Sequence, residues 1–132
     1  MTRILALVAV CSGMLFTTVP IAAHHSFEAE YDRSQKVTLK GTVTKIEWQN
    51  PHVYYYVDVP DANGTVVNWA IEVGAPNGLY RAGWRKDSLK IGDKVTVEAF
   101  RAKAGGPHAN GNSVILANGK RVFNGTADPT AN

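Results

Sequence analysis

Hydrophobic and polar residues alternate along several short stretches of this chain, which predicts a protein that is mainly β. From Val53 to Val59 every second residue is apolar or aromatic, and the alternation returns from Val67 to Val73 after segment 60–64. A period of two residues places alternate side chains on opposite faces of a strand. Because segment 60–64 contains Pro, Asp, Asn and Gly, the two runs predict a β-hairpin.

The stretch before this hairpin, between Gln35 and Trp48, changes its apolar phase. Alternate positions are apolar or small up to Val43, after which the pattern moves to Ile46 and Trp48. A phase change within a strand indicates a bulge or bend, and Gly41 nearby would permit close backbone approach. We expect one long strand that bends enough to serve two halves of a barrel.

The second half of the chain predicts one short helix and further strands. Pro76 to Trp84 has proline at its start and glycine near its end, and Leu79 and Tyr80 are available to face a core. Val95 to Ala99 alternates as a strand, and segments 113–117 and 120–124 predict a pair joined at Asn118-Gly119. Segment 104–112 is rich in Gly, Ala and Asn and predicts a mobile loop.

This order of elements predicts a small OB-like five-stranded barrel with one short helix between the third and fourth strands. The OB-fold is a five-stranded Greek-key barrel with that helix position. An open β-sandwich built from the same strands is the structural alternative.

The first residues have the pattern of a secretory signal peptide. Arg3 precedes a largely apolar stretch, 4–16, and small residues lead to Ala23. Cleavage after Ala23 would leave His24 as the first residue. Cleavage after Ala22 would place Pro20 at position −3, and cleavage after His24 would place a bulky group at position −1, so both alternatives fit less well.

The chain therefore divides into a signal peptide (1–23), an N-terminal His-rich arm (24–34), a barrel domain (35–125) and a flexible tail (126–132). We expect a periplasmic or secreted protein with no stable membrane span after signal removal, because the apolar run is short. The single cysteine, Cys11, lies within the signal. Val10 before it argues against a lipoprotein, and a mature chain without thiols has no disulfide, thiolate metal site or cysteine nucleophile.

The charge pattern argues against a nucleic-acid partner. The formal net charge is +3 at pH 7, and the basic residues are scattered among acids along the chain. Arg81, Arg85 and Lys86 form a local group that suits either an anion or a solvated helix end beside Asp87.

Histidines are the candidate metal ligands. An N-terminal histidine can bind a metal through its amine and its own ring, and a second imidazole then completes a nitrogen-rich set that suits Cu(II). The candidates are His24, His25, His52 and His108. Copper is favoured over zinc by the Irving–Williams order, although an exposed site would also take Ni(II) or Zn(II). The alternative is that His24 and His25 are a polar start to the mature chain, and that His52 is a packed histidine.

A second group of residues is a candidate ligand face on the barrel. Its members are aromatic, amide and charged side chains near the strand ends: Trp48, Asn50, Tyr54, Tyr56, Glu72 and Arg81. Alternation places Glu72 with Asn68 on the face opposite Trp69, so Glu72 is either a surface acid or a buried acid paired with Arg81 or Arg85. The same aromatics also suit ordinary core and cross-strand packing, and Asn50-Pro51 suits a structural corner.

These motifs favour a binding or accessory module over an enzyme. No Gly-rich phosphate loop, zinc-protease helix motif or nucleophile-elbow serine is present. Metal-dependent hydrolysis or redox chemistry at the histidines is the enzymatic alternative, and recognition of a small molecule, glycan or protein on the barrel face is the alternative without metal.

The chain also resembles a family of small secreted bacterial proteins of unknown function. The resemblance rests on His-His-Ser-Phe at 24–27 and Asn-Pro-His at 50–52. Further matching residues are Asn68, Trp69, Pro76, Leu79, Arg81, Gly83, Trp84, Asp87, Leu89, Gly92 and Asp93. The resemblance implies secretion and a small β-barrel-like domain, and it transfers no activity or catalytic residue.

Overall fold

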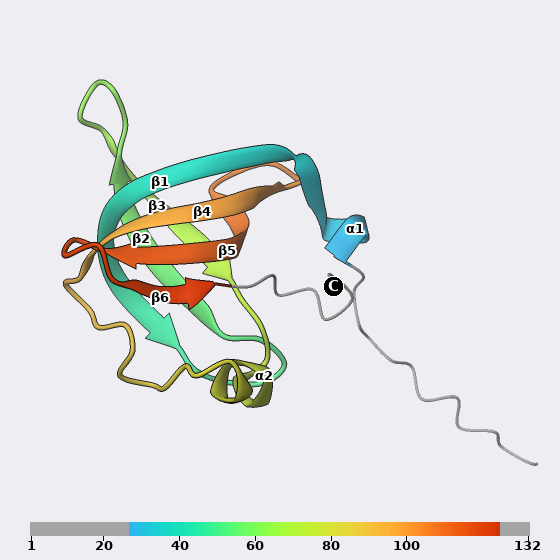
Figure 1. Cartoon of the computed structure of the whole chain (residues 1–132). Coiled ribbons are helices and arrows are strands. Elements are labelled where there is room, and N and C mark those ends of the chain that lie inside the picture. Colours follow the sequence, from blue (N-terminus) through green and yellow to red (C-terminus); the bar gives the residue numbers. More distant parts are fainter. Residues whose placement is uncertain (1–26, 125–132) are drawn as a thin grey trace, which may run out of the picture.

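A ring of hydrogen-bonded strands forms the body of the protein, as Figure 1 shows. The computed structural model describes residues 27–124. The elements in chain order are α1 (Phe27–Glu30), β1 (Tyr31–Glu47), β2 (Tyr54–Pro60), β3 (Val66–Glu72), α2 (Pro76–Arg81), β4 (Lys94–Ala102), β5 (His108–Leu116) and β6 (Arg121–Asn124).

The strand pairing gives an OB-like barrel. The strands follow the order β3-β2-β1-β4-β5-β6, and an additional pairing of β3 with β5 closes the ring. The closing pair is parallel, whereas the other neighbours are antiparallel. The predicted OB-like class and the helix between the third and fourth strands are confirmed. A sixth strand, β6, pairs with β5 outside the closed ring.

Strand β1 bends as its apolar phase predicts. Its register with β2 shifts between Val43 and Lys45, which is where the alternation changes phase. Gly41 has no room for a side chain, because a Cβ there would collide with the carbonyl oxygen of Asp58 and lie 2.7 Å from a methyl group of Val57. The strand begins at Tyr31 instead of Gln35, and a second register shift between Tyr31 and Lys36 explains the irregular pattern of that first part.

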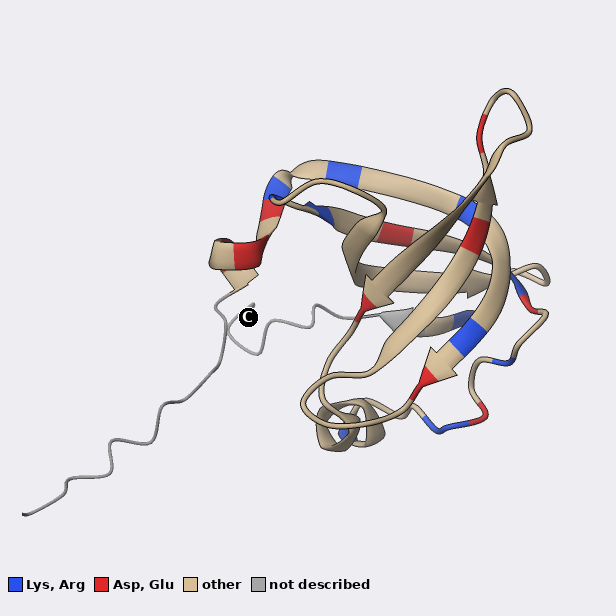
Figure 2. Cartoon of the chain, turned by 180° about the vertical axis from the view of Figure 1, so that it is seen from behind, with Lys and Arg blue, Asp and Glu red and all other residues tan. Residues whose placement is uncertain are grey.

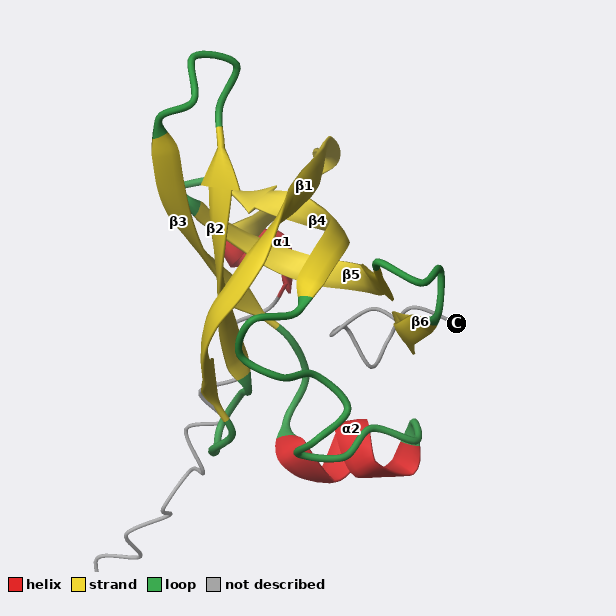
Figure 3. Cartoon of the chain, turned by 90° about the vertical axis from the view of Figure 1, so that its left-hand side faces the viewer, coloured by secondary structure: helices red, strands yellow, loops and turns green. Residues whose placement is uncertain are grey.

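The core fills the ring, and α2 covers one end of it. Tyr55, Val57, Ile71 and Val97 are fully buried. Figure 3 shows α2 at one end of the barrel and the β2–β3 connection at the other. At the α2 end the buried apolar residues are Leu79, Trp84 and Leu89. The prediction that Tyr80 also faces the core is wrong, since 38% of Tyr80 is exposed and its ring packs against Trp48 at the edge of the core.

The prediction of a loop over 104–112 is wrong in its second half, where β5 begins at His108. The small residues that suggested a loop are required by packing inside the barrel. Ala109 is fully buried, and a Cβ on Gly111 would lie 3.0 Å from Ile71, 3.0 Å from Val73 and 3.1 Å from the Tyr55 hydroxyl. Loop-like composition here reflects a crowded strand.

Substitution of Gly111 by valine is expected to lower the free energy of unfolding by about 1–3 kcal/mol, because the added methyl groups overpack the core. Urea unfolding followed by circular dichroism measures this change. Gly78→Ala is the control, since Gly78 in α2 has no neighbouring atom within 4 Å of an added Cβ. Equal stability of Gly111→Val and wild type would contradict the packing role.

Candidate functional site

A buried carboxylate, that of Glu72, stands at the end of β3. It occupies the outward phase of the strand, opposite to Trp69 and Ile71 in the core, yet only 5% of the residue is exposed. A buried carboxylate must find hydrogen-bond partners, because desolvation without them costs several kcal/mol at least. The residues that meet it define the site.

Two tyrosines and two histidines surround this carboxylate. Tyr31 and Tyr54 donate their hydroxyls to Glu72 Oε2, at 2.5 Å and 2.6 Å. His52 Nδ1 lies 2.6 Å from the other oxygen, Oε1, and His108 Nε2 lies 3.9 Å from Oε2. We call these five residues the Glu72 cluster: Tyr31, His52, Tyr54, Glu72 and His108.

The hydrogen bonds assign a proton within the cluster. His108 Nε2 also lies 3.1 Å from the Tyr31 hydroxyl. A hydroxyl has one proton, and that of Tyr31 is donated to Glu72. With the Tyr31 proton donated to Glu72, the His108 tautomer that has its proton on Nε2 completes this contact by donating to the Tyr31 oxygen. Removal of that proton would free Nε2 to act as a ligand.

Each member reaches the cluster from a different part of the fold. Tyr54 faces Glu72 directly across the β2–β3 ladder, and His108 is the first residue of β5. His52 comes just before β2 and Tyr31 begins β1. The parallel pairing of β3 with β5 matches Ala70 with His108 and Glu72 with Asn110, so barrel closure brings His108 to the carboxylate.

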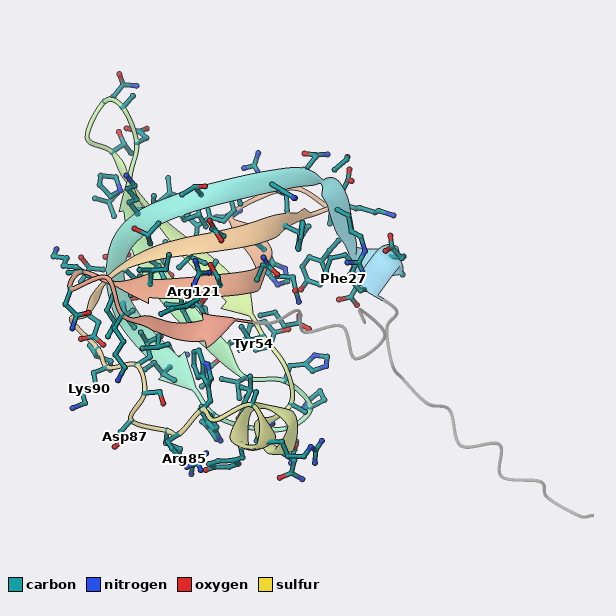
Figure 4. The ribbon with its side chains drawn as sticks, in the orientation of Figure 1. Phe27, Tyr54, Arg85, Asp87, Lys90 and Arg121 are labelled. Carbon is teal, nitrogen blue, oxygen red and sulfur yellow. The ribbon has the colours of Figure 1, made fainter. Side chains whose placement is uncertain are left out.

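The N-terminal arm covers the cluster. Phe27 packs edge-on against Phe100, with ring centroids 5.6 Å apart, and lies 5.5 Å from the Tyr31 ring. The backbone N–H of Lys103 donates to the Glu30 carbonyl at 2.8 Å, and the Lys103 ammonium donates to the Glu28 carbonyl. Figure 4 shows Phe27 and Tyr54 on the side of the barrel where this arm lies.

A hollow of about 460 Å³ opens beside the cluster, under the arm. The walls are small and aromatic side chains, with polar atoms from the cluster: Ala29, Glu30, Tyr31, Tyr54, Ala102, Ala104 and His108. Asn110 lies next to Glu72 on the same face of the sheet and is 2% exposed, and its buried Oδ1 has no hydrogen-bond partner among the described residues. The site thus combines a carboxylate, two imidazoles and a buried amide oxygen.

The tyrosines of the cluster are held in their neutral form. Burial is the largest cause that raises the pKa of Tyr31 and Tyr54 above the ordinary tyrosine value, and the hydrogen bond to Glu72 is the next. Burial alone raises the pKa of Tyr55 in the core. Tyr31 and Tyr54 donate their protons to Glu72, and all three phenols stay uncharged at neutral pH.

The structure divides the candidate ligand face among several places. Tyr54 and Glu72 meet in the cluster, whereas Trp48 packs against α2, with ring centroids 5.3 Å from Tyr80 and 6.3 Å from Trp84. Tyr56 donates to Glu47 on the outer surface. Asn50 and Arg81 are exposed. Glu72 is buried as one alternative stated, but its partners are tyrosines and histidines and not Arg81 or Arg85.

Of the predicted metal ligands, His52 and His108 converge, and His24 and His25 lie outside the described residues. Among residues 27–124, no group of three or more His, Cys, Asp or Glu has the arrangement of a ready metal cage. Sequence reasoning missed Tyr31 and Asn110. Tyr31 precedes the alternating pattern, and Asn110 lies in the segment that resembled a loop.

Two further features of the described residues are the distribution of their charges and the length of their helices. Lys and Arg are interspersed with Asp and Glu over the strands, as Figure 2 shows. No helix in the part of the chain that the structure describes is long and apolar enough to cross a membrane.

The raised tyrosine pKa values predict a loss of stability in alkali. In the unfolded chain tyrosines ionise near pH 10, whereas Tyr31, Tyr54 and Tyr55 resist ionisation when folded. The free energy of unfolding should therefore be independent of these groups below about pH 10 and fall above it. Urea unfolding at stepped pH measures this fall, which Tyr31→Phe should make shallower. An identical pH dependence for both proteins would contradict the assignment.

The comparisons with known proteins give a family and a structural relative. No curated protein matches the sequence. A mitochondrial single-stranded DNA binding protein from S. cerevisiae, Rim1, has a similar structure, with a TM-score of 0.49 and 16% sequence identity over 63% of this chain and 93% of that chain.

The family model covers most of the chain, including His24, His25 and the whole Glu72 cluster. It matches residues 12–112 and is described as a family of unknown function. The chain belongs to this family, DUF6152.

Proposed function

We propose that this protein is a periplasmic or secreted binding module that takes up one divalent metal ion, with copper favoured, at the Glu72 cluster. The convergence of His52 and His108 on one buried carboxylate carries the proposal. These histidines are far apart in the sequence, and they come from the segment just before β2 and from the first residue of β5.

The spacing of the donor atoms supports this use. Nitrogen and oxygen ligands lie about 2.0–2.2 Å from zinc or copper, so two ligands of one ion are separated by roughly 3 Å. His52 Nδ1 lies 2.6 Å from Oε1 of Glu72, and His108 Nε2 lies 3.9 Å from Oε2. The two distances fall on either side of the required value, so small side-chain movements would bring both imidazoles to one ion.

We propose that the histidines before Phe27 supply the remaining ligands. His25 is two residues before Phe27, so the covalent chain limits the separation of the His25 and Phe27 Cα atoms to about 7 Å. Phe27 packs beside Tyr31. We propose that signal cleavage after Ala23 gives His24 a free amine, and that His24 or His25 then completes the coordination. A site with nitrogen donors and no thiolate favours Cu(II).

The first test concerns the start of the mature chain and the metal stoichiometry. Intact-mass analysis of protein exported by its own signal should give the mass of residues 24–132, and native spectra with limiting Cu(II) should show one retained ion. A different start would exclude binding through the His24 amine. No retained copper would contradict metal binding as a whole.

The second test separates the barrel ligands from the arm. Glu72→Gln, His52→Ala and His108→Ala should each weaken Cu(II) binding by about tenfold or more, as loss of a ligand or its supporting partner does. Acetylation of the His24 amine should also weaken binding, because it converts that nitrogen into an amide and leaves every barrel residue intact. Competition with a colorimetric chelator measures the affinities.

Glu47→Gln is the matched control for these variants. Glu47 also accepts a tyrosine hydroxyl, that of Tyr56 at 2.8 Å, but it is half-buried and paired with Lys45 instead of histidines. Its loss should leave copper affinity unchanged. Equal weakening by Glu47→Gln and Glu72→Gln, with folding retained in both, would contradict a metal site at the cluster.

A further inference from the structure

The barrel end opposite α2 contains a charged residue where the strand pattern calls for an apolar one. The inward phase of β4 runs through Val95, Val97 and Ala99, all buried, and its next position is Arg101. The guanidinium carbon of Arg101 lies 5.1 Å from the centre of the Trp69 ring. The side chain therefore folds over the mouth of the barrel.

A hollow of about 360 Å³ lies at this mouth. Its walls are mainly apolar and come from β1, β2, β3 and the loop before β5: Leu39, Val59, Val67, Trp69, Gly106 and Pro107. The mouths of β-barrels are frequent sites for small ligands, which need an apolar wall and a few polar groups that fix their orientation. Here Trp69 and Val67 supply apolar wall, and Arg101 supplies the polar group.

The charges at the mouth indicate the sign of the ligand. The two charged residues in its lining are Arg101 and Asp61. Asp61 is used by its own turn, where Oδ1 accepts the backbone N–H groups of Asn63 and Thr65 at 2.8 Å and 2.9 Å. Among the described residues, no carboxylate forms an ion pair with Arg101. Its planar guanidinium is thus available to a carboxylate, which it can bind through two parallel hydrogen bonds.

We infer that the barrel mouth binds a small amphiphilic anion, a monocarboxylate with an apolar body. The carboxylate would pair with Arg101, and the apolar body would lie against Trp69 and Val67. This site is separate from the Glu72 cluster, because Trp69 and Glu72 occupy opposite faces of β3. The inference does not depend on metal binding.

The test uses octanoate as the probe, with octanol and octylammonium as neutral and cationic comparisons of the same chain length. Titration calorimetry should show octanoate binding at least tenfold more tightly than either comparison. Amide and indole shifts in NMR spectra should change at the mouth and not at α2. Arg101→Gln should weaken octanoate binding by about 10–100-fold, the effect of losing a hydrogen bond to a charged group.

Two further variants keep the result interpretable. Arg121→Gln is the control, because Arg121 lies on β6 and faces Glu98 at 3.8 Å. It should bind octanoate as wild type does. Val67→Ser changes the apolar wall without touching the cation and should also weaken binding. Equal affinity of Arg101→Gln and wild type would show that Arg101 only covers Trp69, and equal affinity for the three probes would likewise overturn the inference.

Discussion

The parallel pairing of β3 with β5 is the constraint on which both the fold and the Glu72 cluster depend. It closes the ring, since every other pairing joins neighbours in an open sheet. The same pairing sets Ala70 beside His108 and Glu72 beside Asn110, so it also delivers an imidazole and an amide to the carboxylate. This closure leaves little space at Ala109 and Gly111, because β3 and β5 approach each other here beside a filled core.

The arm explains why a polar row on the outside of the barrel is partly or fully shielded from water. Tyr54, Glu72 and Asn110 occupy matched positions on adjacent strands, where a small barrel normally meets water. Phe27 and Tyr31 cover one side of this row, and the Tyr31 hydroxyl satisfies part of what the cover removes from solvent. This part of the outer surface is therefore a second, polar region that is shielded from water. Such a region holds acceptors and imidazoles close together without the flexibility of a surface site.

The sequence predicted the barrel because the alternating strands are strong local signals. Residues 53–59 and 67–73 show a period of two, and the phase change after Val43 marked the bend that β1 contains. The prediction from sequence failed at 108–112, where residues small enough for a crowded strand have the composition of a loop. Tyr31 was missed for a related reason: an irregular register separates it from the regular part of β1, so no alternation points to it.

The contacts of a side chain were harder to predict than the face of the strand on which it lies. Alternation placed Glu72 opposite Trp69, which the structure confirms, but a nearby arginine was the expected partner of a buried acid. The actual partners come from β1, the start of β2 and β5, and only three-dimensional closure brings them together. Local periodicity contains no information about such long-range contacts.

Loop 103–107 separates the Glu72 cluster from the barrel mouth and gives them a common wall. Ala104 lines the hollow under the arm, and Gly106 and Pro107 line the mouth. The loop is held at both sides, since the Lys103 N–H donates to the arm and the Pro107 carbonyl accepts the N–H of Ala70 on β3. Because Trp69 and Ala70 are consecutive, one strand presents the apolar mouth inward while its backbone supports the loop. The two hollows can therefore differ in chemistry, one rich in imidazole and carboxylate and the other apolar with a single cation, while sharing the same few residues of backbone.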